Sequence, residues 1–108
     1  MSLVINIYYK GKNGNAKRFA EEMISSGLVD KIRKEEGNIG YGYFFPIEES
    51  ETVLLIDKWK DQQSLEKHHK SSMMNEIMRL REKYNLHMKV EQYTSIETNN
   101  DNQKFIRE

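Results

Sequence analysis

The sequence predicts an α+β domain of the ferredoxin-like class, with element order βαββαβ and an antiparallel sheet. Four short segments are rich in β-branched and aromatic residues, and amphipathic segments with a helical period follow the first and the third of them. The second and third short segments are joined only by a turn, as in a hairpin. In this arrangement, right-handed crossovers lay both helical segments on one face of the sheet.

The first half of the chain is expected to contain one strand and one helix. Residues 3–9, "LVINIYY", form the strand, which ends at the glycine- and asparagine-rich loop "KGKNGN". Asn15 is a suitable N-cap for a helix that ends near Gly37. The helical period is carried by Ala16, Phe19, Ala20, Met23, Ile24, Leu28 and Ile32.

The second half is expected to contain a hairpin, a helical segment and a last strand. "NIGYGYFF" alternates Ile39, Tyr41, Tyr43 and Phe45 before Pro46, and Thr52 to Trp59 form its partner strand. Asp61 can cap a helix through "QQSLEKHH", and Ser71 or Ser72 can restart it. Met73, Ile77, Leu80 and Tyr84 continue the helical period, and Leu86 to Ser95 form the fourth strand.

Length and composition indicate one small domain in residues 1–95. With 108 residues, 37% of them hydrophobic, the chain can bury a single core. Residues 96–108 form a polar tail, expected to be disordered or to reach a partner through Phe105 and Ile106.

Charge and cysteine usage exclude several classes of partner. Seventeen basic and seventeen acidic residues give no net charge and form no basic run, so nucleic acid is not an expected partner. Cysteine is absent, the first residues show no signal pattern, and no apolar run approaches the ~20 residues that span a bilayer. We therefore expect a cytoplasmic protein without a membrane partner.

Both faces of the predicted sheet are apolar. Val53, Leu55 and Trp59 point to one side of the third strand, whereas Leu54 and Ile56 point to the other. Helices cover only one face, so a second sheet is expected to cover the other. The sequence therefore predicts a homodimer in which two sheets meet.

The adjacent histidines of the second helical segment do not have metal-ligand spacing. His68 and His69 project about 100° apart on a helix, whereas helical ligands need the i, i+4 spacing. Leu65 lies three and four residues before them, which turns at least one imidazole towards the sheet. A pocket-facing His68 and a hydrogen-bonded, half-buried His68 are both compatible with the pattern, and no metal site is expected.

Other candidate residues can have either a structural or a functional role. Trp59 ends a strand and can fill the core or contact a substrate. Asn6 is a polar residue in an apolar strand, so it either offers its amide to a ligand or lies at an exposed position. Met73 and the other methionines can line an apolar pocket or fill the core.

The segment "IYYKGKNGNAKRFAEE" looks like the phosphate loop that opens flavodoxins. Lys12, Asn13 and Asn15 stand where that loop needs serine or threonine, and a hairpin follows instead of further parallel units. A flavin site is therefore not expected.

The segments "KEEGNIGYGYF" (Lys34 to Phe44) and "LLIDKWKDQQSLEKHHKSSMM" (Leu54 to Met74) together resemble the antibiotic biosynthesis monooxygenase family, especially its small bacterial quinol monooxygenase-like members. The family shows a glutamate-glycine turn before an aromatic strand, then a tryptophan, a helix cap, a leucine and a histidine. In this chain these positions are Glu36, Gly37, Trp59, Asp61, Leu65 and His68. The resemblance runs from about Leu3 to Ser95 and implies a dimeric α/β barrel.

The resemblance also implies an activity. It suggests a cofactor-free monooxygenase that oxidises a small phenolic or quinol-type aromatic substrate with molecular oxygen, using neither metal nor flavin. Trp59 would be a pocket wall and hydrogen-bond donor, His68 a proton acceptor or oxyanion partner, and Asn6 a polar anchor. Tyr41, Tyr43, Leu65 and Met73 would contact the substrate.

Some features depart from the family pattern and leave alternatives open. Met73 replaces a second histidine found in many relatives. The tryptophan of haem-degrading relatives would fall at His68 and their histidine near Met78, which disfavours haem degradation. An isomerase of the same fold and a non-catalytic barrel that binds a small molecule or acts under stress remain alternatives. Convergence of Trp59, His68 and Asn6 on one cavity would favour catalysis, and a solvent-facing His68 would favour binding.

Overall fold

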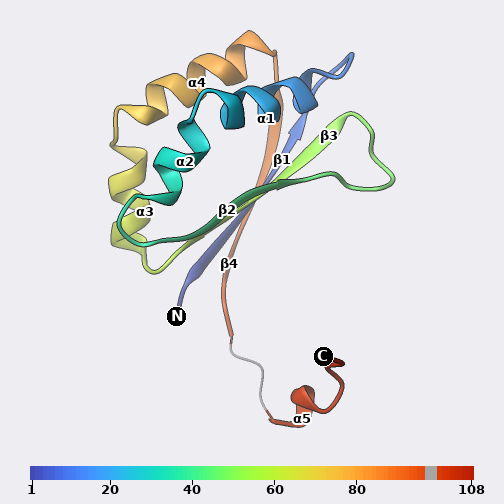
Figure 1. Ribbon diagram of the computed structural model, residues 1–108, viewed down its shortest axis with the longest axis vertical. Coiled ribbons are helices and arrows are strands. Elements are labelled where there is room, and N and C mark those ends of the chain that lie inside the picture. The colour runs from blue at the N-terminus through green and yellow to red at the C-terminus, as the bar shows by residue number, and fades with distance from the viewer. Residues whose placement is uncertain (97–99) are drawn as a thin grey trace.

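The chain folds into a four-stranded antiparallel sheet with helices packed against one of its faces (Figure 1). The computed structural model describes residues 1–96 and 100–108. The elements are β1 (Leu3–Lys10), α1 (Asn15–Ser25), α2 (Leu28–Arg33), β2 (Asn38–Phe44), β3 (Thr52–Trp59), α3 (Gln62–His69), α4 (Met73–Lys83), β4 (His87–Thr94) and α5 (Asn100–Gln103). The strand order is β2-β3-β1-β4. The predicted ferredoxin-like fold is confirmed.

The sheet register decides which side chains meet the helices. Ile5, Ile7 and Tyr9 of β1 are buried beneath the helices, and the intervening residues point to the opposite face. Ile5 pairs with Asp57 of β3, and Ile7 pairs with Leu55. Paired residues share a face, so the inner surface of the sheet is built in rows that cross all strands.

The prediction of one helix from Asn15 to near Gly37 is wrong. The helix ends at Ser25 and a second one, α2, runs from Leu28 to Arg33. Gly27 between them has φ 85°, a left-handed conformation that glycine adopts without steric cost. The break redirects the chain, so that Leu28, Val29 and Ile32 bury a second stretch of apolar surface.

Asn15 is also not the N-cap of α1. Gly14 occupies that position, with φ 78° and no side-chain cap, and Asn15 is the first helical residue. The Asn15 amide instead donates to the Tyr84 carbonyl oxygen at 3.2 Å, which ties α1 to the end of α4.

The second helical segment forms as predicted, with a cap and a restart. The Asp61 side chain accepts a hydrogen bond from the Ser64 backbone N–H at 2.8 Å, so the cap of α3 is confirmed. The helix stops after His69, and α4 begins at Met73, directly after Ser72.

The predicted alternation of the second strand holds only in its centre. Tyr41 is buried and Tyr43 packs against the core, but the register shifts between Asn38 and Gly40. Ile39 lies at this irregularity and is 56% exposed. A bulge adds a residue that the strand period does not count, so Ile39 does not join the inner face.

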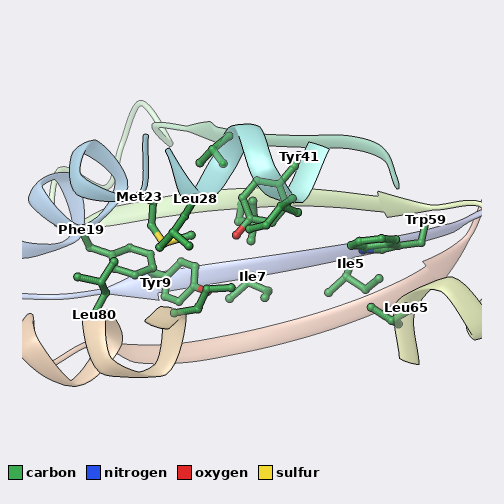
Figure 2. Close-up of a cluster of buried hydrophobic side chains, with 14 residues drawn as sticks. Ile5, Ile7, Tyr9, Phe19, Met23, Leu28, Tyr41, Trp59, Leu65 and Leu80 are labelled. Carbon is green, nitrogen blue, oxygen red and sulfur yellow. The ribbon is translucent and has the colours of Figure 1, made fainter. Parts of the chain in front are cut away.

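The core extends along the whole interface between sheet and helices (Figure 2). Figure 2 shows Tyr9, Phe19, Met23 and Leu80 at one end, and Trp59 with Leu65 at the other. The Tyr9 and Phe19 rings are 4.8 Å apart, and the buried Tyr9 hydroxyl accepts two hydrogen bonds from Arg81, at 2.9 and 3.1 Å.

Among the residues that the structure describes, no helix packs against the opposite face of the sheet (Figure 1). It presents side chains that are only partly buried in the single chain, among them Val4, Tyr8, Leu54 and Ile56. The predicted dimer through this face therefore stays a prediction. Phe105 and Ile106 of the tail are exposed, and their predicted contact with a partner is likewise untested.

Candidate functional site

A cavity of about 260 Å³ lies between the sheet and helices α3 and α4. All four strands contribute to its floor, because it crosses two rows of the sheet: one row contains Tyr41, Asp57, Ile5 and Gln92, and the other contains Leu55, Ile7 and Val90. Its volume is near the lower end of ligand pockets, which run from roughly 300 to 1,000 Å³. The cavity therefore suits a small ring system.

The cavity has an enclosed end and an open side. Asp57, His68 and Leu65, which are all buried, close the inner end. Met88 and Val90 of β4 line the other side and are exposed, at 40% and 55%. A ligand can therefore enter along β4 and reach Asp57 and His68.

His68 is held by a carboxylate on one side and an indole on the other. Its Nδ1 lies 3.0 and 3.1 Å from the two carboxylate oxygens of Glu35, which follows α2. The His68 and Trp59 rings stack, with centroids 4.8 Å apart and planes at 28°. When Nδ1–H donates to Glu35, Nε2 of the neutral ring is left with a lone pair for a proton or hydrogen bond.

Gly37 sets the distance between this carboxylate and α3. It has φ 86°, and a Cβ added there would collide with the Ser64 side chain at the first turn of α3. Its carbonyl oxygen accepts from the Lys60 N–H at 2.8 Å. This close approach brings Glu35 from the turn before β2 within reach of His68, one helical turn after Ser64.

Asp57 is a buried carboxyl group with an unused oxygen. The residue is 5% exposed, and its Oδ1 has no hydrogen-bond partner among the described residues. Burial raises the pKa of Asp57 from 3.8 to about 6, while the Trp59 N–H and His68 lower it and Glu35 raises it. The group can therefore change protonation near neutral pH.

The Trp59 indole N–H is a second unused group. Trp59 is fully buried, and its Nε1 also lacks a hydrogen-bond partner in the described part of the chain. The N–H lies close enough to Asp57 to lower the pKa of its carboxyl as a hydrogen-bond donor would, although no hydrogen bond of ordinary geometry joins the two groups. An acceptor and a donor thus lie near each other with spare capacity.

Two tyrosine hydroxyls complete the polar surroundings. Tyr41 lines the cavity, and its hydroxyl lies 3.2 Å from that of Tyr43. Burial raises the pKa of Tyr41 well above 10.0, with smaller contributions from Tyr43 and Tyr9. Burial similarly raises the pKa of Tyr43. Both phenols therefore stay protonated and can act only as neutral hydrogen-bonding groups.

His69 lies beside His68 on the cavity wall but is exposed. Burial of its ring lowers the pKa of His69, and His68 and Arg81 lower it further. Adjacent positions on α3 thus give one enclosed imidazole and one exposed imidazole, as the 100° spacing implies.

The structure brings several of the predicted site residues together. His68, Leu65 and Tyr41 line the cavity. Trp59 stacks on His68, and the Tyr43 hydroxyl lies against that of Tyr41, but neither Trp59 nor Tyr43 lines the cavity. The catalytic and substrate-binding roles of these residues remain predictions, but His68 does not face solvent.

Asn6 and Met73 are not at this cavity. Asn6 alternates with the buried Ile5 and Ile7, so its side chain points to the face without helices, where its Oδ1 is buried without a partner among the described residues. Met73 lines a polar groove with Ser72 and Glu76, and the next residue, Met74, reaches the cavity. The expected convergence of Asn6 with Trp59 and His68 is therefore not observed in the single chain.

Sequence reasoning missed the two carboxyl groups. Asp57 could have been found, because it lies between Leu55 and Trp59 on the inward-facing positions of a strand. Glu35 gives no such signal, because its contact with His68 joins residues 33 positions apart.

No group of three or more potential metal ligands occurs in residues 1–96 and 100–108. Likewise, no helix in these residues is long and apolar enough to cross a membrane.

Residues 2–80 match the model of a protein family described as antibiotic biosynthesis monooxygenase. A Bacillus subtilis protein named "Putative monooxygenase YcnE" is 31% identical over 70 residues, which are 65% of this chain and 72% of that protein.

Solved structures share the fold at low sequence identity. SnoaB from Streptomyces nogalater, described as a cofactor-independent oxygenase, superimposes with a TM-score of 0.73 at 8% identity, over 90% of this chain and 95% of SnoaB. A conserved protein from Methanosarcina mazei gives a TM-score of 0.74 at 24% identity, over 86% of this chain and 91% of that one. At these identities the likeness concerns the fold alone.

Proposed function

Because the chain belongs to the antibiotic biosynthesis monooxygenase family, we propose that it is a cytoplasmic, cofactor-independent monooxygenase. Its substrate is a small phenolic or quinol-type aromatic, which it oxidises with molecular oxygen. The observation that carries this proposal is the pairing of an apolar cavity with a buried polar end formed by Asp57 and His68, with Trp59 stacked against His68.

The proposed reaction begins when the substrate loses its hydroxyl proton and ends when oxygen is added to the ring. Loss of the phenolic proton makes the ring electron-rich, so that it can pass an electron to O₂ and then form a carbon–oxygen bond. For a ring CH₂ group that becomes a carbonyl, one atom of O₂ enters the product and the other leaves as water. The protein must therefore accept a proton, stabilise the oxyanion and exclude bulk water.

The cavity supplies these three requirements. With the His68 Nδ1 held by Glu35, its Nε2 can accept the proton, and once protonated it can donate a hydrogen bond to the substrate oxyanion. Ile5, Ile7 and Leu55 form an apolar floor under the ring. This apolar surface strengthens the electrostatic interactions at the polar end, because it lowers the local dielectric.

We also propose that the open face of the sheet meets a second copy of the chain. Leu54 and Ile56 of β3 and Tyr8 of β1 lie on this face, which no helix covers. A second sheet would remove this apolar surface from water and would enclose Asn6, whose Oδ1 lacks a partner in the described chain.

Oxygen uptake tests the activity. Purified, metal-stripped protein is supplied with a panel of reduced naphthoquinols and anthrone-like phenols, alongside His68→Ala and the control His87→Ala, which removes an exposed imidazole. We expect uptake above the uncatalysed rate, unchanged by a chelator, equal in the control and reduced by roughly 100-fold or more in His68→Ala. Absence of uptake with folded dimer would refute the oxygenase and favour a binding protein.

A further inference from the structure

Two polar groups on β3 are buried without a hydrogen bond of ordinary geometry. The Asp57 Oδ1 and the Trp59 Nε1 both lack a partner among the described residues, although both residues are at least 95% buried. Buried polar atoms in folded proteins nearly always have a hydrogen-bond partner. These two exceptions lie one residue apart on the same strand and face, and near enough to each other that a single polar group of a ligand could complete the hydrogen bonding of both.

The two groups are complementary to a hydroxyl. A carboxylate oxygen can only accept a hydrogen bond, and an indole N–H can only donate one. A phenolic hydroxyl does both, so its proton can go to Asp57 while its oxygen accepts from Trp59. A carbonyl or an ether could satisfy only the Trp59 donor.

The position of Asp57 in the cavity fits this assignment. It lies in the sheet row between Tyr41 and Ile5, at the enclosed end, where the cavity is also lined by Leu65 and His68. A ring that rests on the apolar floor can therefore place a hydroxyl against the carboxylate.

We propose that Asp57 is a catalytic residue that accepts the substrate's hydroxyl proton, with the Trp59 N–H donating to the oxyanion that is left. In this step the substrate O–H bond breaks, its electron pair stays on the substrate oxygen, and a new O–H bond forms on the Asp57 carboxylate. The inference rests on the proposed function and adds the identity of the first proton acceptor.

The protonation behaviour of Asp57 supports this role. A general base is most effective when its pKa is near the working pH, and burial raises the pKa of Asp57 to about 6. The charged and titratable groups around it come from the elements that enclose the cavity: Tyr41 and Tyr43 of β2, His68 and His69 of α3, Arg81 of α4, Tyr9 of β1 and Glu35. Only the ionised carboxylate can accept the proton, so turnover should rise with pH through about 6.

Ligand binding tests the inference without turnover. Isothermal titration calorimetry measures this binding, because naphthalene probes absorb and emit in the same range as tryptophan. We compare 1-naphthol with 1-methoxynaphthalene, which cannot donate a proton, in the parent protein, Asp57→Asn and Asp30→Asn. The control makes the same change at a carboxylate whose side chain is 75% exposed.

We expect the parent protein and Asp30→Asn to bind the naphthol at least 10-fold more tightly than the ether, and Asp57→Asn to lose this preference. In the parent protein, the single indole N–H resonance should shift at an at least 10-fold lower concentration of the naphthol than of the ether, and this comparison needs no variant. An unchanged preference in Asp57→Asn, or no binding of the naphthol by the parent protein, would overturn the inference.

The outcomes separate this inference from the proposed function. Preferential naphthol binding that depends on Asp57, without oxygen uptake from any quinol, would support the hydroxyl site and refute the oxygenase. Oxygen uptake that keeps its rate and its rise near pH 6 in Asp57→Asn would support the oxygenase and refute the role of Asp57.

Discussion

Replacing Asp57 by asparagine is expected to stabilise the protein at neutral pH but not in acid. Burial raises the pKa of this carboxyl from 3.8 to about 6, so the folded chain holds its proton more tightly than the unfolded chain. Below the pKa of the unfolded chain, the tighter binding of this proton contributes its full amount to the free energy of unfolding. This contribution is lost as the pH rises through the pKa of the folded chain. At about 1.36 kcal/mol for each tenfold change in proton affinity, the loss is roughly 3 kcal/mol.

Asparagine has the shape of the protonated acid and cannot ionise. The difference in unfolding free energy between Asp57→Asn and the parent should therefore grow by roughly 2.5 kcal/mol between about pH 4 and about pH 8, in favour of the variant. Because only the change with pH is compared, any constant packing difference cancels.

Urea unfolding, followed by circular dichroism at several pH values, measures this change. The matched control Asp30→Asn removes an exposed carboxylate, and its difference from the parent should stay nearly constant with pH. A difference for Asp57→Asn that is equally flat would refute the reasoning, because it would mean that the carboxyl ionises as easily in the fold as in the unfolded chain.

Further predictions concern the residues that position the site and the proposed dimer face. Gly37→Ala should destabilise the fold by at least ~2 kcal/mol, because the new methyl group meets Ser64, whereas Gly27→Ala, with a similar φ and open space, should cost about 1 kcal/mol by urea unfolding. Glu35→Gln should lower the free energy of unfolding by roughly 1–3 kcal/mol, because His68 loses a charged hydrogen-bond partner. If the ¹⁵N NMR shifts of the His68 ring do not change in this variant, the contact with Glu35 is contradicted. Ile56→Lys on the open sheet face should convert the proposed dimer to monomer in sedimentation equilibrium, and a dimer that persists would argue against that interface.

The strand elements could be predicted because their inward-facing residues alternate. Ile5, Ile7 and Tyr9 show the period of two that a half-buried strand requires, and β1 forms at their positions. The break at Gly27 was not predicted because the helical apolar period continues across it through Leu28. Periodicity records which residues are buried, but it does not record a change of direction between two helices.

The sequence pattern likewise located some residues of the site and missed others. The three-residue spacing from Leu65 to His68 turns the imidazole inward, and the structure places both on the cavity. Asp57 needed only the strand period to be noticed, whereas Glu35 meets His68 through a turn whose path depends on Gly37 approaching Ser64. The family resemblance implied Asn6 at the site, whereas its polar character alone left an exposed position open, and alternation along β1 places it on the other face.

The most direct test of the proposed oxygenase is a reaction under ¹⁸O₂ with metal-stripped protein and an anthrone-like phenol, followed by mass spectrometry of the product. The mechanism predicts one ¹⁸O atom in each product molecule, at a rate that depends on Asp57 and His68. A product that carries no ¹⁸O, or that forms equally fast without the protein, would contradict it.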